Sequence, residues 1–141
     1  MKLLNKKIER AFTLTQDLTE HLDEAHLSLN LPGLPSNKIG EQLWCMVGAR
    51  ESYLNAIKNE KWVGFSCSLK DTASKPAVLA ALTQSQLAVT QFISATTLNE
   101  TQADFLLDLL EHEIQHHGQL IRYIYGNKLS FPASWNARYT V

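Results

Sequence analysis

The feature that most constrains the fold is the spacing of apolar residues, which recur at steps of three and four through long stretches of the chain. Such spacing places apolar side chains on one face of an α-helix, whereas a half-buried strand would alternate them at every second position. The longest stripe lies near the N-terminus and comprises Leu4, Ile8, Ala11, Thr15, Leu18, Leu22, Ala25 and Leu29. It predicts one helix over about residues 2–29, which ends where Pro32, Gly33 and Pro35 follow.

Three further helices are expected. The second covers about residues 37–59, and the third begins at Pro76, a residue that suits the first helical turn, and ends near Thr97. The fourth, which Asn99 or Thr101 can cap, reaches about residue 125. No strand-like alternation and no internal repeat interrupts this pattern.

The segments between and after these helices also carry information. The connection KWVGFSCSLKDTASK is about fifteen residues long, which is long for a helix link and indicates an extended crossover or a functional loop. The C-terminal tail looks irregular, but Phe131 and Trp135 predict that it packs on the helices. Four long helices in one chain of 141 residues predict an all-α protein, a four-helix bundle that forms a single domain over residues 1–141.

Charge and cysteine usage exclude several classes of function. The chain has 13 Lys and Arg against 14 Asp and Glu, with no basic block, so we expect no nucleic-acid partner and no anionic membrane. No apolar run is long enough for a membrane span, and charges interrupt the N-terminal stretch MKLLNKKIERAF too early for an export signal. We therefore expect a cytoplasmic protein in which Cys45 and Cys67 are reduced thiols.

The segment LLEHEIQHHGQL places two histidines four residues apart on the fourth helix. They continue an inward line made of Phe105, Leu109, His112, His116, Gln119 and Tyr123. Each histidine could be a core residue bonded to a buried neighbour, because an unpartnered buried imidazole costs about 1–3 kcal/mol. The alternative is a metal site, since the spacing aims both imidazoles at one point and bundles build metal sites from inward side chains.

A metal site needs a ligand from another helix. The HEIQH segment has the spacing of the zincin motif with Glu113 as base, but a zincin needs a sheet-edged cleft that an all-helical chain does not offer. Both His21 and His26 are expected on the surface. Cys45, in the second helix, would be a good zinc ligand as a thiolate, although a free cysteine is more often a small buried hydrophobe.

Two segments of the chain resemble the DinB-like superfamily of DNA-damage-inducible, metal-dependent proteins. In HEIQHHGQLIRYIYGNKLSFPASW, the residues His112, His116, Gly118 and Gln119 match the end of that family's fourth helix, with His117 at the usual arginine. The second segment, IGEQLWCMVGARESYL, is similar to the family's ligand helix, where a histidine follows a Leu-Trp pair. That position is Cys45 here. Helix number, the long connection and chain length also agree, so the resemblance covers nearly the whole chain.

The resemblance implies an up-down-down-up bundle, a homodimer, and a divalent metal held by three histidines near one end. By position, the ligands would be Cys45, His112 and His116. The cysteine would favour zinc over harder ions, with nickel or another transition metal as alternatives, or it could mark a degenerate, metal-free site. The implied activity is transfer of a thiol to a small-molecule electrophile, or hydrolysis. The alternative is a non-catalytic stress-response or dimerisation module with a structural or vestigial site.

Other polar and aromatic residues have two interpretations each. Arg50 and Glu51 predict a surface or interhelix ion pair, in preference to a clamp for a substrate anion. Cys67 lies in a packed loop or at the mouth of the site. Glu111 and Glu113 are expected beside the inward line and are not predicted to act as a base. The tryptophans Trp44, Trp62 and Trp135 are expected in the core or at a cap, where one could also line a substrate pocket.

Overall fold

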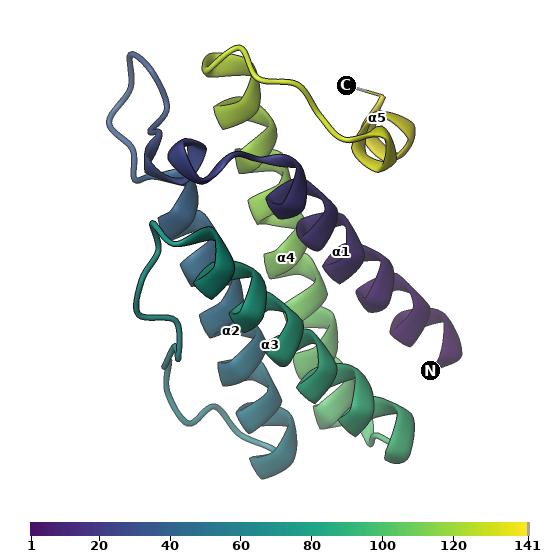
Figure 1. Cartoon of the computed structure of the whole chain (residues 1–141). Helices are drawn as coiled ribbons and strands as arrows, with labels where there is room; N and C mark the ends of the chain where they lie inside the picture. The colour runs from purple at the N-terminus through teal and green to yellow at the C-terminus, as the bar shows by residue number, and fades with distance from the viewer. Residues whose placement is uncertain (141) are drawn as a thin grey trace.

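The computed structural model describes residues 1–140 and is all-helical over that range, without a strand (Figure 1). Its elements are α1 (Lys2–His21), a short 3₁₀ helix η1 (Glu24–Ser28), α2 (Ile39–Asn59), α3 (Lys75–Ala95), α4 (Glu100–Gly126) and α5 (Ala133–Tyr139). The all-α class predicted from the sequence is confirmed.

The long helices pack side by side. Figure 1 shows that α1 and α4 run in one direction along the molecule and that α2 and α3 run in the other. Helix α2 packs on both α3 and α4, and α1 packs on the same two helices, so the four enclose a common interior. The packing of α2 on α4 is the most extensive of these interfaces, and it positions the candidate site.

Side-chain caps set several helix boundaries. Asn99 accepts from the backbone N–H of Gln102, while the Gln102 side chain bonds back to the Asn99 backbone, forming a capping box at the start of α4. Ser74 caps α3, and Pro76 occupies its first turn. The predicted starts at Asn99 and Pro76 therefore agree with the structure to within a residue.

The first predicted helix was too long. Helix α1 ends at His21, because Leu22 has an extended backbone and residues 24–28 form η1 instead. Leu22 and Leu27 are still buried, so the apolar period continues across the break although the helix does not. A repeating apolar pattern indicates which residues are buried, and here it continues although the chain leaves α1 and enters η1.

The C-terminal tail contains a helix that the sequence analysis missed. Within α5, Trp135 is completely buried, and its indole N–H donates to the backbone carbonyl of Leu14 in α1 at 2.6 Å. Its ring also stacks on Phe131 at a centroid distance of 6.1 Å. The tail therefore packs on the long helices, as Phe131 and Trp135 predicted.

The connection between α2 and α3 is an extended crossover held along α2. Ser52 exchanges hydrogen bonds with the backbone of Ser66, its hydroxyl donating to the carbonyl at 3.1 Å and accepting from the N–H at 3.0 Å. The Glu51 carboxylate accepts from the Ser68 backbone N–H at 2.9 Å. Farther along, a methyl group at Gly40 would overlap the carbonyl oxygen of Thr72. Glycine thus allows the crossover to approach the first turn of α2.

The interior has two hydrophobic clusters, one toward each end of the helices. Between them, each long helix contributes buried polar side chains, which we call the polar layer: Thr15, Arg50, Ser85, Glu113 and His117. On α1, for example, Phe12 belongs to one cluster and Leu18 to the other, with Thr15 between them. The polar layer therefore crosses the middle of the molecule.

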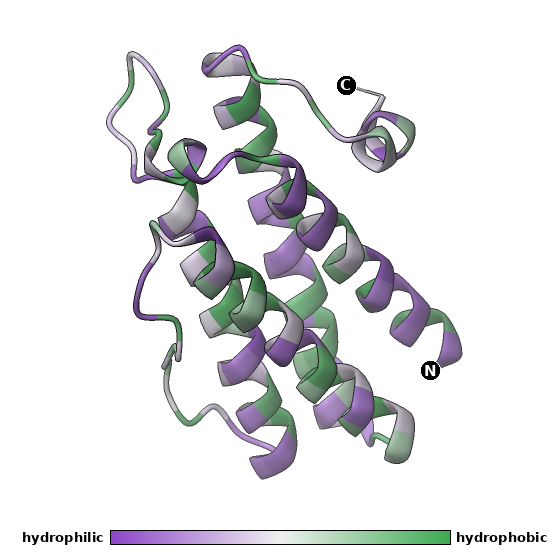
Figure 2. Ribbon diagram, in the orientation of Figure 1, coloured by the Kyte–Doolittle hydropathy of each residue, from purple (hydrophilic) through white to green (hydrophobic). Residues whose placement is uncertain are grey.

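Hydrophobic and hydrophilic residues are interleaved along every long helix, as Figure 2 shows. Within residues 1–140, no helix is both long and apolar enough to cross a membrane.

Candidate metal centre

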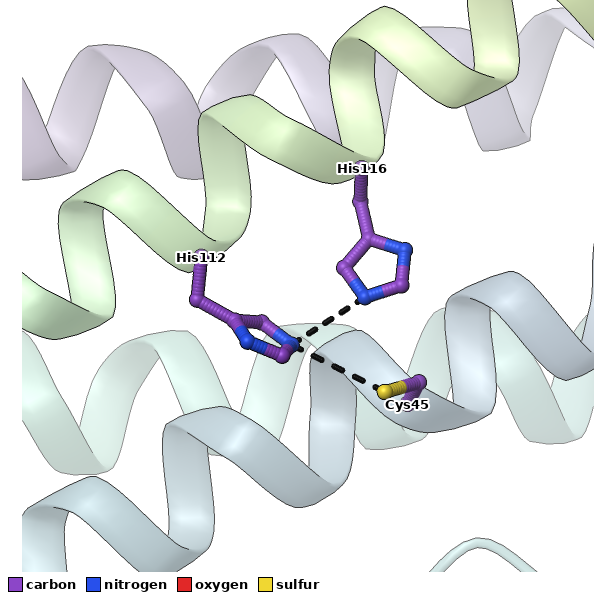
Figure 3. Close-up of side chains that lie close together, drawn as sticks. All are labelled: Cys45, His112 and His116. Carbon is purple, nitrogen blue, oxygen red and sulfur yellow. Dashed lines mark hydrogen bonds between the residues drawn. The ribbon is translucent and has the colours of Figure 1, made fainter.

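Three side chains from α2 and α4 meet at the edge of the interior: Cys45, His112 and His116 (Figure 3). The Cys45 sulfur lies 3.7 Å from Nε2 of His112, and the two histidine Nε2 atoms are 3.1 Å apart. All three candidate ligand atoms lie within 4.8 Å of one another. The structure therefore brings together the residues that the sequence analysis named, and this cluster could hold a metal ion.

These separations fit a small divalent ion. Tetrahedral zinc, with bonds of about 2.0–2.3 Å to nitrogen and sulfur, places its ligand atoms roughly 3.3–3.6 Å apart. Two of the three separations, 3.1 and 3.7 Å, lie close to that range, and the third is no longer than 4.8 Å, so side-chain rotations could bring the atoms into position for the bonds. A soft thiolate beside two imidazoles is a donor set typical of zinc.

The protonation states also suit coordination. Burial lowers the pKa of His112 from its ordinary value, and burial together with the neighbouring His112 lowers the pKa of His116 to about 4. Both rings are therefore neutral at neutral pH and have a nitrogen lone pair to offer. Burial raises the pKa of the Cys45 thiol, so a bound cation would have to displace the thiol proton.

Gln42 supports the centre from one turn before Cys45, and the sequence analysis missed it. Its Oε1 lies 2.5 Å from Nδ1 of His116, the ring nitrogen that faces away from His112. The signal available in the sequence was the i, i+3 spacing of Gln42 and Cys45 on one helix, which puts both on the face toward α4.

The inward line predicted for α4 is only partly confirmed, since three of its six residues are buried. Gln119 is exposed and His112 is only half-buried, whereas Glu113 and His117 are completely buried. The expectation that Glu113 points beside the inward face was therefore wrong. Apolar spacing cannot predict the burial of a polar residue such as Glu113, because that burial depends on hydrogen-bonding partners on other helices.

Glu113 joins the polar layer through a chain of hydrogen bonds. Its carboxylate accepts from the Thr15 hydroxyl at 2.6 Å, and Thr15 lies 2.8 Å from Nε2 of His117. Nδ1 of His117 lies 2.6 Å from the Tyr139 hydroxyl in α5. If Thr15 donates to Glu113, Nε2 of His117 carries the proton and Nδ1 accepts from Tyr139. Every donor then faces an acceptor between the tail and the core.

Arg50 is the cationic partner of Glu113. Its guanidinium binds both carboxylate oxygens, at 2.5 and 3.2 Å, and donates to the Leu82 carbonyl at 3.1 Å. It also lies over the Phe12 ring at 4.0 Å from the centroid. Burial alone would raise the pKa of Glu113, but Arg50, through its charge and hydrogen bonds, acts together with His117 and Thr15 to outweigh burial and hold the pKa below its ordinary value. Arg50 thus forms an interhelix ion pair and presents no free group to a substrate.

A surface pocket of about 410 Å³ adjoins the cluster. Its lining residues are Asn37, Glu41, Trp44, Cys45, Lys70 and Thr72. Lys70 and Thr72 belong to the extended crossover, so the long connection builds one wall of this pocket. A second hollow, of about 540 Å³ between Leu4 and the first turns of α4, contains none of the three clustered residues.

The remaining sequence candidates lie elsewhere. His21 is exposed and binds Ser130, while His26 caps η1. Cys67 donates to the Trp44 carbonyl from the crossover and is not part of the cluster. Of the tryptophans, Trp135 is a core residue as expected, whereas Trp44 is 37% exposed and Trp62 is 49% exposed, so neither of these two lies in the core. Trp44 lines the pocket beside Cys45 instead.

Comparisons of the chain with protein-family models, with curated proteins and with solved structures find no match. The resemblance to the DinB-like superfamily therefore stays a prediction from the two segments that carry it.

Proposed function

We propose that this protein is a divalent-metal-binding four-helix bundle of the DinB-like kind, in which Cys45, His112 and His116 hold zinc. The observation that carries the proposal is the convergence of these side chains from two helices, with the two imidazole Nε2 atoms 3.1 Å apart. The opposed directions of α1 and α4 relative to α2 and α3 support the up-down-down-up arrangement that the resemblance implies.

We further propose that the centre acts on a small molecule, in a thiol transfer or a hydrolysis. Zinc with an open position would polarise a substrate group or lower the pKa of a bound water or thiol. Two features support an open position. No fourth His, Cys, Asp or Glu joins the cluster in residues 1–140, and Cys45 lies in the wall of the adjoining pocket.

The pocket residues would bind and orient that molecule. Lys70 can attract an anionic group and Glu41 a cationic one, while the Trp44 ring offers an apolar surface. The alternative, a structural or vestigial site in a non-catalytic module, would not need a pocket at the ligand.

Thermal unfolding with and without zinc tests the proposal, starting from protein stripped with a chelator. A ligand that binds only the folded state at a hundredfold excess over Kd adds about 2.7 kcal/mol. For a domain of this size the melting temperature should rise on the order of 5–10 °C. The variants His116→Ala and Cys45→Ser should lose most of this rise yet remain folded, because two hydrophobic clusters sustain the core.

The matched control is Cys67→Ser, which changes the other half-buried cysteine, and it should keep the full zinc response. Absence of a zinc-dependent rise in the wild-type protein would show that the histidines are core residues bonded to their neighbours. An equal loss in Cys67→Ser and Cys45→Ser would assign zinc to a different set of ligands.

A further inference from the structure

Gln42 contacts His116 on the side of its ring that faces away from Cys45 and His112. It is 7% exposed, it lies on α2, and its Oε1 is 2.5 Å from Nδ1 of His116. An imidazole that binds a metal through Nε2 must carry its proton on Nδ1, and that proton needs an acceptor. An amide oxygen can fill that role because it only accepts hydrogen bonds.

A second set of contacts orients the Gln42 amide. Its Nε2 donates to Oδ1 of Asn37 at 2.9 Å. The same Oδ1 accepts from the Tyr123 hydroxyl at 2.5 Å, and the Asn37 backbone carbonyl lies 2.9 Å from that hydroxyl. With the Gln42 nitrogen facing Asn37, its oxygen faces His116, so each contact in this series pairs a donor with an acceptor.

We propose that Gln42 is a positioning residue that holds His116 as its Nδ1–H tautomer. The Nε2 lone pair of His116 then points to the place among the three ligand atoms where zinc would bind. Asn37 and Tyr123 anchor Gln42 in this role. The inference rests on the proposed function for its effect on zinc, but the tautomer itself is a property of the metal-free protein. Partners of this kind typically change metal affinity by ten- to a hundredfold.

The first measurement is the ¹⁵N chemical shifts of His116 in metal-free wild-type protein at about neutral pH. A low pKa keeps this ring neutral there, so the shifts report which nitrogen carries the proton. The structure predicts the Nδ1–H form. A ring with its proton on Nε2 would mean that the Gln42 amide is turned so that its nitrogen, not its oxygen, faces Nδ1 of His116. This result would overturn the proposal.

The second measurement is the Kd for zinc, by competition with a chromogenic chelator, in three variants. Gln42→Met keeps the size of the side chain but removes the acceptor, so Kd should rise ten- to a hundredfold and His116 should become a mixture of tautomers. Gln42→Glu keeps an acceptor facing His116 and should keep the Nδ1–H form. Because its second oxygen removes the donor to Asn37, its Kd should still rise, but less than that of Gln42→Met. Gln119→Met, at an exposed glutamine of α4, is the matched control and should change neither quantity.

Two outcomes separate this inference from the proposed function. If wild-type protein binds zinc and Gln42→Met binds it equally well, the role of Gln42 is wrong while the metal centre stands. If wild-type protein does not bind zinc, the metal centre is wrong, and the tautomer of His116 in the metal-free protein still decides what Gln42 does.

Discussion

The guanidinium of Arg50 and the carboxylate of Glu113 form an ion pair at 2.5 Å in which neither side chain has any solvent exposure. Desolvation of two charges offsets most of their attraction, so such a pair adds little net stability over an apolar replacement. Removal of one partner, in contrast, leaves an uncompensated charge in the interior. The pair is also part of the polar layer, to which every long helix contributes.

A double-mutant cycle on this pair should be strongly non-additive. Glu113→Leu alone should cost about 3–5 kcal/mol, because Arg50 loses its counter-ion. Adding Arg50→Met should recover most of that loss, since two apolar side chains can pack between the hydrophobic clusters. Urea unfolding of the four proteins measures the coupling. Additive costs would show that the two charges do not depend on each other.

Folding stability should fall as the pH is lowered from about 6.5 toward 4. Burial holds the pKa of His117 at about 4, below its ordinary value of 6.5, so the unfolded chain binds a proton over this range that the folded protein does not. Stability is therefore highest above pH 6.5. The loss from this residue approaches roughly 3 kcal/mol near pH 4, and His116 adds in the same direction.

Urea unfolding of metal-stripped protein at several pH values measures this loss. The variant His117→Gln should be less stable at neutral pH but should depend less on pH than the wild-type protein. Parallel pH profiles for the two proteins would show that His117 is not the buried neutral ring described above.

Two helical glycines should respond oppositely to alanine. Nothing lies within 4 Å of a methyl group placed at Gly118, so Gly118→Ala should stabilise α4 by about 0.5–1 kcal/mol. At Gly40 the methyl group would overlap a backbone carbonyl of the crossover, and Gly40→Ala should destabilise by about 1–3 kcal/mol. Thermal melts compare the two. A stable Gly40→Ala protein would mean that the crossover does not pack closely against α2.

Zinc binding at about neutral pH should release about one proton per ion. Both histidines are already neutral, whereas the Cys45 thiol has a raised pKa and must ionise to bind. Affinity should therefore increase about tenfold per pH unit below the thiol pKa. Calorimetric titrations in buffers of different ionisation enthalpy count the protons. Release of no proton would mean that Cys45 is not a ligand.

Regular features of the fold could be predicted from short segments of sequence. Helix α4 begins after Asn99 because that side chain and Gln102 satisfy each other's backbone groups, which is a local interaction. The break after His21 could not be predicted in the same way, since Leu22 and Leu27 stay buried on either side of it. Apolar spacing records which residues face the interior, and a change of helix direction can preserve it.

In the candidate site, too, local sequence patterns predicted some residues, whereas contacts between distant segments could not be predicted. Cys45, His112 and His116 could be named because their spacing and two matched segments are visible in the chain. The burial of Glu113 could not, because it depends on Arg50 and Thr15, which are 63 and 98 residues away in sequence. The contact of Gln42 with His116 also spans 74 residues. The spacing of Gln42 and Cys45 could place Gln42 on the face toward α4, but only the packing of α2 on α4 shows which residue it meets.

X-ray absorption at the zinc edge of the loaded protein tests the metal centre most directly. The wild-type spectrum should show one sulfur at about 2.3 Å and nitrogen or oxygen ligands at about 2.0–2.1 Å, and the sulfur should disappear in Cys45→Ser but remain in Cys67→Ser. A zinc shell without sulfur, identical in the wild-type protein and in Cys45→Ser, would contradict the assignment of Cys45, His112 and His116 as the ligands.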